Sequence, residues 1–180
     1  SSQFVTSLLI SAPYAKQETV IELQGTITSR PYIDMTLRMM ESFGVQVTEP
    51  EVGVFHIPVQ AYTNPPEYQV EPDSSTATYP FLIAAITGGK VSVPGLPPKP
   101  ELSLQGDTQF AWLLEKMGCS VSHADGKLTV EGPKSGVLKA VEVDMNTMTD
   151  AFLGLSCIAA VCQGTTRITN IANQRVKECN

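Results

Sequence analysis

Residues 107–131 of this 180-residue chain read DTQFAWLLEKMGCSVSHADGKLTVE, and this stretch decides the fold. An apolar helix is expected over Asp107–Met117, and the glycine that follows stops it because glycine readily adopts the left-handed C-terminal cap. Two strands, Ser120–His123 and Lys127–Glu131, are separated by Asp125-Gly126, a pair typical of a two-residue hairpin turn. The stretch therefore predicts a helix followed by an antiparallel hairpin.

The same order of elements recurs along the chain, and each unit reads helix, strand, helix, strand, strand. In the first copy these elements are expected at Gln3–Ala12, Thr19–Gln24, Pro31–Phe43, Val45–Thr48 and Gly53–Pro58. The second copy places the helix Tyr79–Thr87 and the strand Lys90–Pro94 ahead of residues 107–131. A third copy begins at Asp150 with the helix Ala151–Gln163 and is cut off at the end of the chain.

Such mixed units predict an α/β (α+β) layer architecture. The helix Ala151–Gln163 is apolar around its whole circumference, which is typical of a helix buried within a domain. We therefore expect repeated βαβαββ-type units with the helices buried in the middle and the sheets outside.

Composition excludes several functional classes. The chain is 42% hydrophobic and 17% charged, as expected for a globular protein, and its net charge of −6 argues against a nucleic-acid partner. No apolar run is long enough to span a bilayer, and no basic leader opens the chain, so no membrane partner and an intracellular location are expected. The four cysteines lack metal-site spacing; we expect no metal, and Cys157 and Cys162 are interpreted as reduced core residues.

Polar groups stand before two helices of the first copy. Ser1-Ser2-Gln3 offers hydroxyl, amide and backbone N–H groups at a helix start, where an anion can bind. Ser29 and Tyr32 bracket Arg30 at the next helix start, so hydroxyl and guanidinium groups could converge on a phosphate. The alternative for both segments is helix capping, with Arg30 as a surface residue.

Two further segments carry candidate proton-transfer groups. Asp150 precedes an apolar helix, where a carboxylate is stabilised by the helix dipole, and a capping role is the alternative. Asn173, Lys177 and Glu178 follow a predicted strand and place an amide, a cation and a carboxylate close together. This last segment is a candidate proton-relay and anion-binding site, and the alternative is a solvated surface.

Together these segments resemble the 5-enolpyruvylshikimate-3-phosphate (EPSP) synthases. The wording of residues 171–180, IANQRVKECN, is most similar to the version inside fungal-type pentafunctional AROM polypeptides. The resemblance runs the whole length of the chain, with Arg30 standing where lysine is usual. It implies inside-out α/β barrel lobes of the enolpyruvyl transferase type, with residues 1–70 belonging to the first lobe and residues 71–180 to the second.

The resemblance also implies an activity. It is transfer of the enolpyruvyl group of phosphoenolpyruvate to the 5-hydroxyl of shikimate 3-phosphate, without metal or organic cofactor, on the shikimate pathway to chorismate and aromatic amino acids. Asp150 and Glu178 would be catalytic: the first would accept the hydroxyl proton and the second would move protons on the enolpyruvyl methylene carbon. The residues implied to bind substrate are Ser1, Ser2, Gln3, Ser29, Tyr32, Asn173 and Lys177.

The chain is expected to be a fragment with little turnover alone, whose other partner is the rest of the parent enzyme's two lobes. The AROM-like wording implies a cytoplasmic location. Two alternatives remain open at this point. One is a related transferase acting on a UDP-linked amino sugar, and the other is a non-catalytic folding or partner-binding module of a larger polypeptide.

Overall fold

The computed structural model describes residues 2–176, and the chain divides into two compact units, residues 1–69 and residues 70–180. Each unit has its own hydrophobic core. They are described here one after the other.

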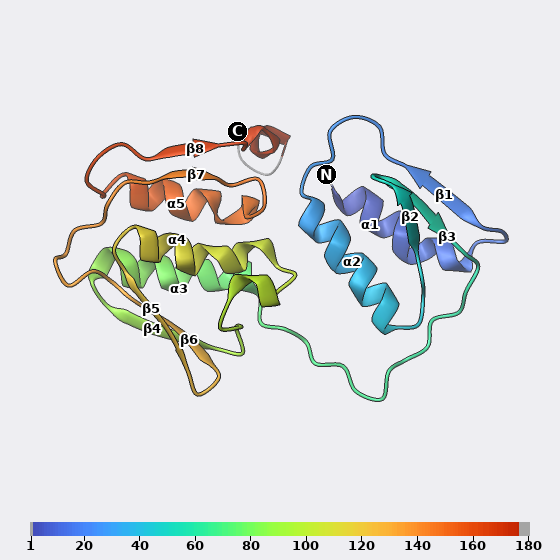
Figure 1. Cartoon of the computed structure of the whole chain (residues 1–180), viewed down its shortest axis with the longest axis horizontal. Coiled ribbons are helices and arrows are strands. Elements are labelled where there is room, and N and C mark those ends of the chain that lie inside the picture. The colour runs from blue at the N-terminus through green and yellow to red at the C-terminus, as the bar shows by residue number, and fades with distance from the viewer. Residues whose placement is uncertain (1, 177–180) are drawn as a thin grey trace. The chain divides into compact units, whose positions relative to one another are not determined.

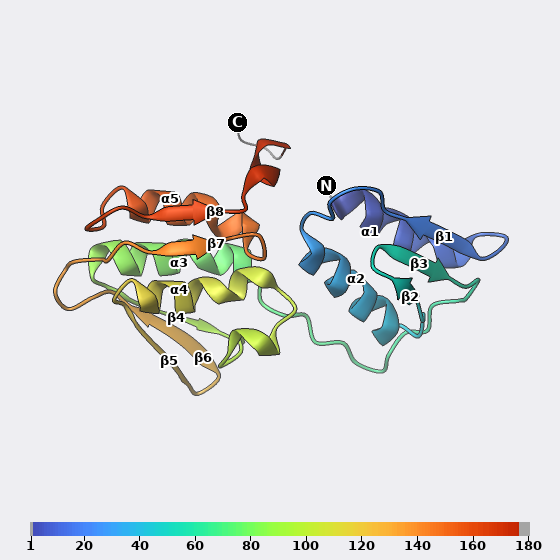
Figure 2. The same ribbon diagram turned by 45° about the horizontal axis from the view of Figure 1, so that its top comes forward.

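Unit 1 contains two helices and a three-stranded antiparallel sheet of order β1-β3-β2. Its elements are α1 (Ser2–Ser11), a short 3-10 helix (Ala12–Tyr14), β1 (Thr19–Glu22), α2 (Arg30–Ser42), β2 (Thr48–Glu51) and β3 (Val54–Ile57). The two helices lie side by side (Figures 1 and 2) and pack with the sheet around a core that includes Leu9, Ile33, Met40, Phe55 and Ile57.

The end of α2 agrees with the sequence prediction, whereas the next strand does not. Gly44 has φ +83°, the left-handed conformation expected of the residue after the helix. The predicted strand Val45–Thr48 is wrong, because β2 starts at Thr48. Val45 is instead fully buried, and its N–H donates to the Met40 carbonyl at 2.9 Å, so this apolar residue closes the helix rather than joining the sheet.

The described part of unit 2, residues 70–176, contains three α-helices, five strands and several short 3-10 helices. Its helices and strands are α3 (Ser74–Thr87), β4 (Lys90–Pro94), α4 (Phe110–Lys116), β5 (Ser120–Ala124), β6 (Lys127–Glu131), β7 (Glu142–Asp144), α5 (Phe152–Ala159) and β8 (Arg167–Thr169). The 3-10 helices are η2 (Pro100–Leu102), η3 (Gly106–Gln109), η4 (Thr149–Ala151) and η5 (Ala172–Val176).

The predicted hairpin is present. β5 and β6 pair in antiparallel register, and Asp125 and Gly126 both have positive φ, 50° and 69°, as a type I′ turn requires. β4 pairs with the other edge of β6, while β7 and β8 form a separate parallel pair. Figure 1 shows α3, α4 and α5 between these two sheets, so unit 2 has the predicted layering with the helices in the middle.

Several details of unit 2 differ from the prediction. α3 begins at Ser74 rather than Tyr79, and β7 was not predicted at all. α5 is shorter than the predicted Ala151–Gln163 helix, ending at Ala159. The apolar helices are also not buried on every side, because Tyr79 and Ile83 are 58% and 59% exposed.

The cysteine prediction also needs correction. Cys157 is exposed and Cys162 only partly buried, whereas Cys119 is the buried thiol of the described residues. Cys119 follows α4 and belongs to the core of unit 2, where burial raises the pKa of its thiol to about 11. Within residues 2–176, no helix has both the length and the apolarity needed to cross a bilayer.

Candidate functional site

The start of α1 borders a cavity in unit 1. Ser2, a buried residue at the first position of the helix, lines a cavity of about 240 Å³. The other walls come from the loop after β1 and from the apolar side of the helices, namely Val5, Glu22, Leu23, Gln24, Thr26, Ile27, Thr28 and Ile33. Gln3, the next predicted residue, is exposed, and Ser1 lies outside the described residues.

The chemistry of this cavity is polar but not cationic. Hydroxyl and amide groups from Ser2, Gln24, Thr26 and Thr28 can hydrogen-bond to an anionic oxygen. Lysine and arginine are absent from the described wall, and the Glu22 carboxylate would repel an anion. A phosphate in this cavity would therefore need cations from outside it. The threonines and Gln24 were missed from the sequence, because their loop carries no recognisable phosphate-binding pattern.

Ser29 holds an unusual backbone conformation at the start of α2. Its φ and ψ are 56° and 41°, the left-handed region, which costs a non-glycine residue roughly 1–2 kcal/mol. The side chain is buried and makes no capping hydrogen bond to the helix in the described structure, so the capping alternative does not account for it. Its carbonyl instead accepts from the Tyr32 N–H at 3.1 Å. Strained residues of this kind cluster at functional sites.

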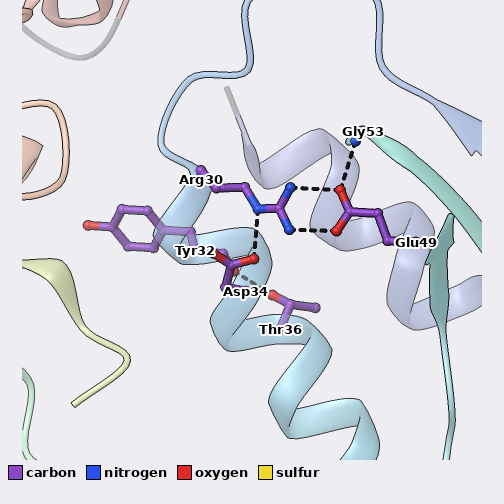
Figure 3. Close-up of polar contacts among 6 residues, drawn as sticks. All are labelled: Arg30, Tyr32, Asp34, Thr36, Glu49 and Gly53. Atoms are coloured by element: carbon purple, nitrogen blue, oxygen red, sulfur yellow. Dashed lines mark hydrogen bonds and ion pairs between the residues drawn. The ribbon is translucent and has the colours of Figure 1, made fainter. Parts of the chain in front are cut away.

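Arg30 does not converge with Ser29 and Tyr32 as the sequence suggested. Its guanidinium donates to both oxygens of Glu49 and to one oxygen of Asp34 (Figure 3). Figure 3 also shows the Tyr32 ring pointing to the opposite side of α2 from this guanidinium. Arg30 is thus neither a free surface residue nor a group aimed with Tyr32 at a ligand, because opposite charges on Glu49 and Asp34 already hold it.

Asp150 lies in η4, immediately before α5, and is exposed to solvent. The neighbours Thr149 and Ala151 are buried at 2% and 0% exposure, so the backbone that carries Asp150 is fixed in the core. The helix-capping alternative is not seen in the described structure, since the N-cap position of α5 is Ala151. The pKa of Asp73 is lowered overall, mainly by the Thr76 hydroxyl, and the negative charge of Asp150 opposes this lowering.

Asn173 comes to the same end of unit 2 as Asp150. The adjacent Gln174 donates its side-chain amide to the Thr149 carbonyl, which ties η5 to η4. Asn173 itself is only 9% exposed, and within residues 2–176 neither Nδ2 nor Oδ1 has a hydrogen-bond partner. Buried amides are nearly always hydrogen-bonded, so a side chain in this state is suited to receive a ligand. Lys177 and Glu178 lie outside the described residues.

A polar network lies at the start of α3, and its hydrogen bonds run from exposed Asp73 to buried Asp107. Asp73 caps α3 by accepting from the backbone N–H groups of Ser75 and Thr76, and the hydroxyl of Thr76 is the main cause of its lowered pKa. The Ser75 hydroxyl donates to Asp107 at 2.6 Å, although Asp107 was predicted only as a helix start. The available signal was Asp73 itself, whose capping position predicts a helix that begins at the next residue.

Comparison with known proteins gives consistent matches over the whole chain. A family model described as EPSP synthase (3-phosphoshikimate 1-carboxyvinyltransferase) matches residues 1–180. The pentafunctional AROM polypeptides 1 and 2 of Lodderomyces elongisporus are each 51% identical over 185 residues. These matches cover 100% of this chain and 12% of each relative, so the chain spans about one eighth of the relatives' length.

Solved structures share the fold. EPSP synthase from Acinetobacter baumannii matches with a TM-score of 0.71 and 24% identity, covering 99% of this chain and 40% of that one. The enolpyruvyl transferase NikO from Streptomyces tendae matches with a TM-score of 0.68 and 16% identity, covering 93% of this chain and 39% of that one. At these identities the likeness concerns the fold alone, and it confirms the predicted α/β architecture.

Proposed function

Because this chain belongs to the EPSP synthase family, as the resemblance predicted, we propose that it forms part of an enzyme that converts shikimate 3-phosphate and phosphoenolpyruvate into the enolpyruvyl ether and phosphate. Residues 1–70 and 71–180 would then belong to the enzyme's first and second lobes. The observation that carries the proposal is the buried Asn173 amide, which has no partner within residues 2–176 and lies at the end of unit 2 that holds Asp150.

The proposed substrate contacts follow from the chemistry of each group. Shikimate 3-phosphate presents hydroxyls and a phosphate, which suit the hydroxyls of Ser1, Ser2, Ser29 and Tyr32 and the amides of Gln3 and Asn173. Lys177 would supply a point charge for the phosphate. The cavity beside Ser2 has no cation in its described wall.

The reaction needs proton transfers at two positions. As the 5-hydroxyl oxygen attacks phosphoenolpyruvate, its proton passes to Asp150, and the methylene carbon of phosphoenolpyruvate gains a proton from Glu178. Loss of a proton from the resulting methyl group then accompanies the departure of phosphate, which restores the enolpyruvyl double bond. An exposed carboxylate on a fixed backbone, as at Asp150, can reach a bound hydroxyl and accept its proton.

The remaining partner would be the rest of the same enzyme. Tyr79, Ile83 and Ile86 recur at helical spacing along α3 and are all exposed, as a helix face does when further protein is meant to cover it. The chain corresponds to 40% of a solved EPSP synthase chain, so most of that fold lies in segments that this chain does not contain. We therefore propose little turnover by the chain alone. The similarity to AROM polypeptides is the basis on which we propose a cytoplasmic location for the parent enzyme.

The test uses the longer polypeptide that carries this sequence, incubated with shikimate 3-phosphate and phosphoenolpyruvate. Release of phosphate, dependent on both compounds and absent with shikimate as the control, is the expected result. Asp150→Asn should lower kcat by roughly 10²- to 10⁴-fold, the usual contribution of a general base. Full activity of that variant would exclude Asp150 from proton transfer, and no phosphate release by the unaltered protein would overturn the proposed function itself.

A further inference from the structure

Arg30 and Glu49 form a two-point ion pair in unit 1, and neither residue is among the proposed substrate contacts. Arg30 Nη1 and Nη2 lie 2.7 Å and 2.6 Å from the two carboxylate oxygens of Glu49. Both side chains are mostly buried, at 32% and 21% exposure, so water screens the pair only partly. A two-point contact of this kind fixes orientation as well as distance.

Other groups reinforce the pair. Arg30 Nε donates to Asp34 Oδ1 at 2.7 Å, and the Gly53 N–H donates to Glu49 Oε1 at 2.7 Å (Figure 3). The guanidinium also lies over the ring of Phe55, a fully buried core residue, at 5.8 Å from its centroid. As a result, the Glu49 hydrogen bond raises the pKa of Arg30, and the same bond, seen from Glu49, lowers the pKa of that carboxyl.

The pair connects the start of α2 to β2 and to the turn after β2. Arg30 is the first residue of α2 and directly follows the strained Ser29, whereas Glu49 belongs to β2. The turn after β2 contains Gly53, whose carbonyl accepts from the Leu23 N–H at 2.9 Å. Leu23 in turn lines the cavity beside Ser2. The start of α2 is therefore held to the sheet and, through one more residue, to the cavity wall.

This connection bears on the left-handed backbone conformation of Ser29. A left-handed serine returns to an ordinary conformation unless its surroundings hold it, and its side chain supplies no helix-capping bond in the described structure. The adjacent two-point ion pair restricts the rotation of the first turn of α2, which also carries Tyr32. Lysine would weaken this network, because an ammonium group cannot donate along two parallel directions to Glu49 while also bonding Asp34.

We propose that Arg30 and Glu49 are positioning residues, which fix the first turn of α2 and so hold the Ser29 and Tyr32 side chains in the orientation that receives the substrate. This inference rests on the proposed function, because it assigns the orienting role toward shikimate 3-phosphate. It differs from a purely structural role in predicting a local effect at the start of α2 and a loss of ligand affinity, both larger than the general loss of stability in unit 1 explains.

The experiment compares Arg30→Lys and Glu49→Gln with Arg38→Lys in the 180-residue chain. Arg38 is the matched control, since it lies on the same helix and its contact with Glu41 is exposed and 3.6 Å long. Amide hydrogen exchange is measured by NMR without ligand, and the Kd for shikimate 3-phosphate is measured below the melting temperature of each variant. Shikimate, which lacks the phosphate, is the ligand control.

We expect Arg30→Lys and Glu49→Gln to speed exchange of the Tyr32 amide, which donates to Ser29, by about 10-fold and to raise Kd by a similar factor. The double variant should be little worse than either single one, and Arg38→Lys should match the unaltered chain. Unchanged Tyr32 exchange would overturn the inference whatever the ligand does. Faster exchange with an unchanged Kd would overturn the orienting role. If the unaltered chain does not bind shikimate 3-phosphate, both the proposed function in this chain and the orienting role are contradicted.

Discussion

The free-energy cost of burying the Asn173 amide can be measured in the absence of ligand. Its side chain is 9% exposed, and within residues 2–176 neither polar atom of the amide has a hydrogen-bond partner. A buried polar group left in this state costs about 1–3 kcal/mol. Leucine has a similar size and no polar atoms, so Asn173→Leu should remove this cost and stabilise the chain.

The size of the effect follows from two opposing contributions. Relief of the two amide atoms is worth roughly 3 kcal/mol, taking a value near the lower end for each. The different shape of leucine in a packed site subtracts about 1 kcal/mol. Unit 2 should therefore gain about 2 kcal/mol in its free energy of unfolding. For a domain of about this size, each kcal/mol raises Tm by roughly 4 °C, which gives a rise of about 8 °C.

Differential scanning calorimetry of the ligand-free 180-residue chain measures this shift. Asn146→Leu is the matched control, since Asn146 is an exposed residue of the same unit and its replacement should change the unfolding free energy by less than about 0.5 kcal/mol. Asn173→Leu should also lose any phosphate-dependent response to shikimate 3-phosphate. A lower Tm for Asn173→Leu would refute the reasoning, because it would mean that the amide already stabilises the ligand-free fold.

Three further outcomes are expected. Hydrogen bonding to Arg30 lowers the pKa of Glu49, so the ion pair stabilises unit 1 above the unfolded-state pKa of about 4.3. This stabilisation is lost as the pH falls through the folded-state pKa. Glu49→Gln should therefore lower the free energy of unfolding by about 1–2 kcal/mol at pH 7 and reduce its pH dependence, as measured by chemical unfolding. Gly106→Ala should destabilise unit 2 by at least about 2 kcal/mol in thermal unfolding, because the added Cβ would overlap a backbone carbonyl of the neighbouring loop. Gly154→Ala should be neutral or stabilising, because its Cβ would lie 3.6 Å from the Phe110 ring, an ordinary contact. Iodoacetamide at pH 8 should label exposed Cys157 well before buried Cys119 in the native chain, as followed by peptide mass spectrometry.

Each of these outcomes has a clear opposite. The ion-pair account fails if Glu49→Gln keeps the same loss of stability on acidification as the unaltered chain. The packing account of η3 fails if Gly106→Ala and Gly154→Ala have equal unfolding free energies. Labelling of Cys119 at the same rate as Cys157 would contradict the burial of Cys119, and denatured chain is the control in which both thiols should react equally.

Local chemistry was enough to predict much of the fold. The Asp125-Gly126 hairpin and the ends of the helices at Gly44 and Gly118 all have the positive φ angles that the sequence implied. These features depend on neighbouring residues, which a sequence displays directly. The strand Lys90–Pro94 was predicted with its observed bounds for the same reason, since alternating apolar residues follow a glycine stop.

The errors occur at elements whose bounds depend on residues that are distant in the sequence. α3 extends back to Ser74 although its first turns are poor in helix-forming residues, because Asp73 caps it and Ser74 hydrogen-bonds to Thr108 across the core at 2.7 Å. The short strand β7 exists through its parallel pairing with β8, a partner far along the chain. No local pattern reveals such pairings.

The candidate site shows the same division. Residue types at helix starts identified Ser2, Ser29, Asp150 and Asn173 as candidates, but their states depend on the tertiary fold. Neither the left-handed conformation of Ser29 nor the state of the Asn173 amide, which has no partner within residues 2–176, could be predicted, since each depends on what the surrounding elements supply. The role of Arg30 was likewise hidden, because its partner Glu49 belongs to a strand whose position was predicted wrongly.

The most direct test of the central claim is an amide-resolved NMR titration of the 180-residue chain with shikimate 3-phosphate, using shikimate as the control that lacks the phosphate. The account predicts phosphate-dependent shifts at Ser2, Ser29 and Tyr32 in unit 1, and at Asp150 and Asn173 in unit 2. Shifts at these residues would show that the chain carries substrate-binding groups of the proposed enzyme. A well-dispersed spectrum that shikimate 3-phosphate leaves unchanged would contradict the claim that this chain binds the substrate.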